Sequence, residues 1–132
     1  MIVDSSALVA IILDEPEGSP FARAILMART PRLSAASYVE VALRLDGNLD
    51  EGQDTRLDAV IATLGLQIVP VTAAHARLAR DAFNTFGKGR HPARLNFGDC
   101  LTYALAKATG EPLLYKGEDF VRTDLPRARP HC

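Results

Sequence analysis

Hydrophobic positions along the chain follow two alternating spacings. Short apolar runs, which are typical of buried strands, occur at residues 2–3, 66–71 and 112–115, and residues 32–34 could form a further short strand. Between these runs, hydrophobic residues recur every three or four positions and predict helices over residues 5–13, 21–28, 37–45, 57–64, 73–86 and 97–109. Strands that alternate with helices predict an α/β fold, in which helices cover both faces of a central parallel sheet.

Residues that commonly begin or end helices mark several boundaries. Ser37 starts an apolar helical pattern and has a glutamate three positions later, so it is expected to be the N-cap of a capping box. Thr72 is expected to cap the helix over residues 73–86. Gly65 and Gly110 are expected to end the helices over residues 57–64 and 97–109. The polar segment 48–53 predicts a turn.

Length and composition fit one domain over residues 1–132. With 48% hydrophobic and 23% charged positions, the 132 residues can form a continuous core. Only the segment 126–132, rich in Pro and Arg, is expected to be a loosely held tail. No apolar run approaches the roughly 20 residues that span a membrane, and the two cysteines lack the pattern of a disulfide framework. We therefore expect a cytoplasmic protein without a membrane partner.

Acidic residues occur where a parallel sheet would collect a ligand site. Asp4 directly follows the first strand, and Glu118 and Asp119 follow the last, while Glu40 and Asp99 lie early in helices. Ligand sites in such folds gather beyond the carboxyl ends of the strands. Clustered carboxylates bind protons or a cation, and Mg²⁺ prefers one or two of them together with water. A magnesium site of this kind suits phosphodiester hydrolysis.

Each of these acids also has an ordinary structural explanation. Asp4 could be a helix N-cap, and Asp99 could complement the dipole in a first helical turn. Glu40 could serve solely as the second residue of a capping box, and Asp119 could cap a turn. Position alone leaves both interpretations open.

Basic residues gather in the loop before residue 97. The net charge of −1 gives no overall indication of a nucleic-acid partner, but a local basic strip is sufficient for one. The strip consists of Lys88, Arg90, His91 and Arg94, and Lys116 is a further candidate. Either these side chains contact RNA phosphates or they form a solvated basic loop.

Four segments together resemble the acidic motifs of PIN-domain nucleases. They are residues 1–10 (MIVDSSALVA), 37–42 (SYVEVA), 95–104 (LNFGDCLTYA) and 112–120 (PLLYKGEDF). Their order and spacing, and the total length, are similar to those of the VapC toxins of bacterial toxin–antitoxin pairs. The stretches 87–91 and 116–124 resemble a mycobacterial-type VapC subgroup.

This resemblance implies a PIN-like α/β/α sandwich and an endoribonuclease that depends on Mg²⁺, with Mn²⁺ as a possible substitute. It implies that Asp4 and Asp99 are the central metal ligands. Glu40 and Asp119 would complete the acidic set, which would bind one or two metal ions. The implied substrate is transfer RNA or another structured RNA. The implied partners are a VapB antitoxin and a second copy of the chain, in a homodimer and in a toxin–antitoxin hetero-oligomer.

The chain departs from the family pattern at the fourth acid. Many relatives have an aspartate where this chain has Gly117, so the role could belong to Asp119, to Glu118 or to Asp124. Two further positions match supporting polar residues of the family, namely Ser6 and Asn96.

Other classes of protein fit less well. A phosphate-receiving signalling domain needs an acceptor aspartate after a middle strand, where this chain has Val69-Pro70-Val71-Thr72. An aspartate-nucleophile phosphatase needs Asp-x-Asp after the first strand, where this chain has Asp4-Ser5-Ser6. A catalytically weak PIN-fold binding module stays open because of Gly117.

Overall fold

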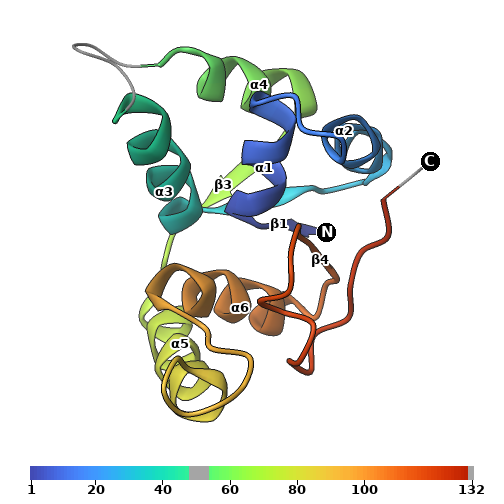
Figure 1. The fold of residues 1–132 in the computed structure, drawn as a ribbon. Helices are drawn as coiled ribbons and strands as arrows, with labels where there is room; N and C mark the ends of the chain where they lie inside the picture. The colour runs from blue at the N-terminus through green and yellow to red at the C-terminus, as the bar shows by residue number, and fades with distance from the viewer. Residues whose placement is uncertain (48–53, 131–132) are drawn as a thin grey trace.

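The computed structural model describes residues 1–47 and 54–130, so the turn predicted at 48–53 lies outside the described residues (Figure 1). The strands are β1 (Ile2–Val3), β2 (Arg32–Ser34), β3 (Gln67–Val69) and β4 (Leu113–Leu114). The helices are α1 (Ser5–Ile12), α2 (Gly18–Met27), α3 (Ala35–Asp46), α4 (Arg56–Leu64), α5 (Ala73–Phe86) and α6 (Phe97–Thr109). Within the described ranges, none of the helices has both the length and the apolar character to cross a membrane.

The strands form one parallel sheet in the order β3-β2-β1-β4. The central strand β1 pairs on both sides, since Ile2 lies opposite Arg32 of β2 and Leu113 of β4. Parallel pairing places the carboxyl ends of all these strands at the same edge of the sheet. Asp4 leaves β1 at this edge, and the chain after β4 leaves it beside Asp4.

Alternate residues of the strands point into two separate cores. Val3 and Leu114 pack with residues of α1, α2, α3 and α4 on one face, and Ile2 and Leu113 pack with α5 and α6 on the other. Figure 1 shows α1, α2 and α4 on one side of the sheet and α5 and α6 on the other. All four side chains are fully buried, and each contributes roughly 2 kcal/mol by its burial. The predicted α/β/α sandwich with a central parallel sheet is confirmed.

The structure confirms several predicted helix boundaries, whereas α2 begins at Gly18, three residues before its predicted start. Gly65 and Gly110 adopt the left-handed conformation after α4 and α6, and the Thr72 hydroxyl accepts the His75 N–H at the start of α5. The prediction that Ser37 caps α3 is wrong. Ser34 is the N-cap, because its backbone is still extended and its hydroxyl accepts the Ala36 N–H at 3.2 Å.

The shift has a physical cause and a consequence. Ala35 and Ala36 are strong helix formers, so the helix begins two residues before its predicted start and its N-cap lies three residues before the predicted one. Ser37 is therefore a buried residue inside the helix, and Glu40 closes no capping box with it.

The segment after β4 is held against the sheet as far as residue 128. The Leu113 N–H donates to the Pro126 carbonyl and the Ala128 N–H donates to the Leu113 carbonyl, both at 2.9 Å. Ala128 is buried, and the Arg127 guanidinium stacks on the Tyr115 ring. Residues 126–128 of the expected tail thus pack against β4, whereas residues 131–132 lie outside the described residues.

The position of the α3 cap can be tested by substitution. Ser34→Ala removes the hydroxyl that accepts the Ala36 N–H, so we expect it to lower the free energy of unfolding by about 1 kcal/mol in urea denaturation. The matched control is Thr55→Ala, because Thr55 is the N-cap of α4 but makes no side-chain cap hydrogen bond. Equal losses in the two variants would contradict the assignment.

Candidate active site

Four carboxylates from different parts of the chain line one cavity at the carboxyl edge of the sheet. Asp4 follows β1, Glu40 lies in α3, Asp99 lies in the first turn of α6, and Asp119 lies in the segment after β4. The cavity has a volume of about 210 Å³, and Arg44 also lines it. The fold thus brings together acids that lie between 20 and 115 residues apart along the chain.

Asp4 is the most deeply buried member of the acidic set. Its side chain is only 4% exposed, and its Oδ2 accepts the Ser6 N–H at 3.1 Å and the Ser6 hydroxyl at 2.6 Å. The Ser6 Oγ in turn accepts the Lys116 N–H at 3.0 Å. Because Lys116 donates to Ser6, the Ser6 proton is directed to Asp4. Asp4 is therefore the N-cap of α1 and also a cavity-lining acid.

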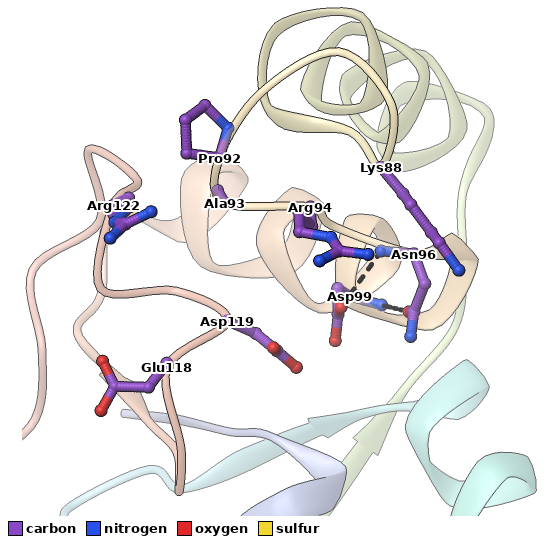
Figure 2. Close-up of a pocket in the computed structure, with 9 residues that line it drawn as sticks. All are labelled: Lys88, Pro92, Ala93, Arg94, Asn96, Asp99, Glu118, Asp119 and Arg122. Carbon is purple, nitrogen blue, oxygen red and sulfur yellow. Dashed lines mark hydrogen bonds between the residues drawn. The ribbon is translucent and has the colours of Figure 1, made fainter.

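Asp99 is held by a capping box at the start of α6. Its Oδ2 accepts the Asn96 N–H at 3.1 Å, and its own N–H donates to the Asn96 Oδ1 at 2.9 Å (Figure 2). Asn96 is thus the N-cap, and both residues line the acidic cavity. The capping explanation and the site explanation of Asp99 are compatible, since the cap fixes the carboxylate at the cavity wall.

Glu40 approaches α6 closely at a residue that sequence reasoning did not single out. A Cβ at Gly98 would overlap the Glu40 carboxylate in its present position, so a larger residue there would require this side chain to move. The sequence signal was the glycine that directly precedes Asp99 in the first turn of α6.

Burial and mutual repulsion raise the pKa of the clustered acids. Burial raises the pKa of Asp4, and burial followed by the charge of Asp4 raises the pKa of Glu40. For Asp99, burial first and then the charges of Asp119, Asp4 and Glu40 raise the pKa to about 7. A cation would relieve this repulsion and favour the ionised carboxylates.

The donor set fits a hard divalent cation. Among the described residues, no three His, Cys, Asp or Glu side chains form a ready-made cage for an ion. Mg²⁺ does not need such a cage, because it typically takes one or two carboxylates and keeps several waters. Every acidic member of the cavity offers oxygen, which is the ligand atom that Mg²⁺ and Mn²⁺ prefer.

A second, larger cavity of about 460 Å³, called the open cavity below, adjoins the first. The two cavities share Asn96, Asp99 and Asp119. In Figure 2, Asp119 points toward Asp99, whereas Glu118 points away from it. Asp119 lines both cavities and Glu118 only the open one. Among the candidates for the fourth acid, Asp119 therefore has the geometry that brings its carboxylate to the other three.

The predicted basic residues divide into two groups. Lys88 and Arg94 line the open cavity, together with Arg122, which sequence reasoning missed (Figure 2). Arg90 instead stacks on the Phe83 ring at 5.5 Å. Lys116 pairs with Glu15 at 3.1 Å and with a second glutamate of the same loop, so its charge is already compensated.

Asp124, a candidate supporting residue, lies away from both cavities. Its Oδ1 accepts the Tyr103 hydroxyl at 2.6 Å and its Oδ2 accepts the Lys107 ammonium at 2.7 Å. These bonds lower the pKa of Asp124. The residue thus joins the segment after β4 to α6 and does not line the acidic cavity.

Comparisons with known proteins agree with this geometry. The PIN domain family matches residues 1–125. Ribonuclease VapC28 of Mycobacterium tuberculosis is 50% identical over 97% of both chains. The crystal structure of Mycobacterium tuberculosis VapC20, a Sarcin-Ricin loop cleaving toxin, superposes with a TM-score of 0.73 over 98% of both chains at 18% identity. A toxin–antitoxin complex from Klebsiella pneumoniae gives a TM-score of 0.72 at 13% identity, over 99% of this chain and 98% of that one.

At these low identities the two structures support the fold alone, whereas the sequence relative supports the activity. The chain belongs to the PIN-domain family and, within it, to the VapC ribonucleases, which are endoribonuclease toxins of toxin–antitoxin systems. Divalent-metal dependence is general among such nucleases, and the acidic cavity has the donor atoms for it.

The raised pKa of Asp99 predicts a pH dependence of stability in metal-free protein. Between the ordinary value of 3.8 and about 7, the native state holds more protons than the unfolded state. The free energy of unfolding should therefore fall as pH rises through this range. We expect denaturation in EDTA from pH 5 to pH 8 to show this fall, and Asp99→Asn to reduce it. A slope that Asp99→Asn leaves unchanged would refute this origin.

Proposed function

We propose that this ribonuclease cleaves structured RNA, with transfer RNA as the first candidate, and uses Mg²⁺ for which Mn²⁺ can substitute. The observation that carries the proposal is the meeting of Asp4, Glu40, Asp99 and Asp119 in one cavity. Asp4 and Asp99 are the central ligands, because both are buried and held by hydrogen bonds that fix their carboxylates. Glu40 and Asp119 complete the set.

Each acid has a distinct part in the proposed reaction. When bound, the divalent ion supplies Lewis-acid stabilisation of the charge that develops on the phosphoryl group. Asp4 and Asp99 hold that ion, while Glu40 and Asp119 orient the attacking water or bind a second ion. In-line attack of water on the phosphorus leaves a 5′-phosphate and a 3′-hydroxyl. Ser6 keeps the Asp4 carboxylate oriented through its 2.6 Å hydrogen bond.

The open cavity is the proposed path for the phosphates that flank the cleaved bond. Lys88, Arg94 and Arg122 surround it beside the acids (Figure 2). Arg94 has a φ of 57°, which is uncommon outside glycine, and its N–H donates to the His91 carbonyl at 3.0 Å. Such a conformation persists only where the surrounding chain imposes it. It supports a preformed position for the Arg94 guanidinium.

We also propose two protein partners. Exposed hydrophobic side chains on α2 and α3, namely Leu26, Met27, Val39 and Leu43, offer apolar area to a VapB-type antitoxin. An apolar hollow of about 360 Å³ between α5 and α6, with Phe97 at 82% exposure, offers a surface for a homodimer. Both contacts together give a toxin–antitoxin hetero-oligomer that acts in the cytoplasm.

The nuclease proposal is tested by cleavage of a transfer RNA mixture with Mg²⁺ or EDTA. Asp4→Asn keeps the shape but removes the charge, and we expect it to slow cleavage more than 100-fold, since even outer-shell partners of a metal typically cost about 10–100-fold. The control is Asp124→Asn, because Asp124 lies away from the cavity. Cleavage that survives EDTA, or equal rates for Asp4→Asn and wild type, would disprove it.

The division of the basic residues predicts different salt dependences. We expect Arg94→Ala to weaken RNA binding and to reduce the slope of log K against log salt by about 0.7–0.9, the value of one phosphate contact. Arg90→Ala should change the slope less, because Arg90 stacks on Phe83. Fluorescence anisotropy from 50 to 200 mM salt, in Ca²⁺ or with the Asp4→Asn background, measures both. A larger effect for Arg90→Ala would reverse the assignment.

A further inference from the structure

Two buried hydroxyls meet between the helices that carry Glu40 and Asp99. The Ser37 Oγ of α3 lies 3.0 Å from the Thr102 Oγ1 of α6. Ser37 is 1% exposed and Thr102 is fully buried, and neither residue lines the acidic cavity. Two apolar side chains of similar size could pack here without the cost of burying hydroxyls, so this polar contact requires an explanation.

The position of the pair in the two helices supplies one. Ser37 precedes Glu40 by three residues, and Thr102 follows Asp99 by three residues. Residues three apart are neighbours on a helix surface, so the hydroxyl contact joins the turns that hold the two acids. At the same level, Gly98 lets the Glu40 carboxylate approach α6. The contact therefore fixes α3 against α6 where their acids face the cavity.

Asp4 is the third polar residue associated with the Ser37–Thr102 pair. The Thr102 side chain also acts on the Asp4 carboxylate and lowers its pKa, although burial raises that pKa more. A hydroxyl has one proton, so when Thr102 directs its proton toward Asp4, the Ser37 hydroxyl is the donor of the 3.0 Å contact. The Ser6 hydroxyl, which accepts from the Lys116 N–H, donates to the Asp4 Oδ2. Hydroxyl groups of α1 and α6 therefore both act on the Asp4 carboxylate.

We propose that Ser37 and Thr102 are positioning residues, which hold Asp4, Glu40 and Asp99 in the arrangement that binds a divalent cation. The proposal rests on the metal-dependent function proposed above. Neither hydroxyl contacts the ion or the RNA, because both are buried outside the cavity. Their effect is on the affinity of the metal-free protein for the ion.

The test measures Mn²⁺ binding to protein without RNA by electron paramagnetic resonance. Thr102→Val keeps the shape of the side chain but removes the donor, and we expect about 10-fold weaker Mn²⁺ binding, within the range typical of outer-shell partners. Thr102→Ser restores the hydroxyl and should bind Mn²⁺ nearly as wild type does. Ser37→Ala leaves the Thr102 donor in place and should produce a smaller loss.

The matched control is Thr109→Val in the same helix. The Thr109 hydroxyl donates to the Leu105 carbonyl, away from the acids, so its removal should leave Mn²⁺ affinity unchanged. If folded Thr102→Val and folded Ser37→Ala both bind Mn²⁺ as tightly as wild type, the inference about the two hydroxyls is overturned, while the proposed metal site stands. Absence of Mn²⁺ binding by wild type would overturn the proposed metal site, and this inference with it.

Discussion

Repulsion among carboxylates at one edge of a parallel sheet is the constraint on which the site depends. Asp4, Glu40, Asp99 and Asp119 line one cavity of about 210 Å³. In water such charges would separate, but here each is fixed by its own element, and burial raises the pKa of three of them. The protein holds them together through local hydrogen bonds, and a bound divalent cation would relieve the remaining repulsion.

The fold supplies this arrangement through short strands and well-defined helix starts. β1 and β4 contribute two residues each to the sheet, yet their parallel pairing fixes where Asp4 and the Asp119 segment leave it. The N-caps of α1 and α6 are part of the site, because Asp4 and Asn96 satisfy backbone N–H groups at the same edge. In the proposed metal site, Asp4 therefore serves both as a helix cap and as a ligand.

Local patterns predicted the parts of the molecule that depend on local chemistry. The strands, the helix stops at Gly65 and Gly110, and the acids that follow strand ends could be recognised from spacing and residue type. The N-cap of α3 was misplaced, because apolar periodicity does not register two alanines that extend the helix. Tertiary pairing was beyond reach: Lys116 binds glutamates 99 and 101 residues away, and Arg122 reaches the open cavity only once the sheet is formed.

The acidic cavity is the place where we propose that the divalent ion binds. Crystals grown with Mn²⁺ and measured at its absorption edge would reveal the ion directly by anomalous scattering. We expect an anomalous peak within coordination distance of the Asp4 or Asp99 carboxylate, in the cavity that Glu40 and Asp119 also line. A peak elsewhere, such as beside Asp124, with none in the acidic cavity, would contradict it.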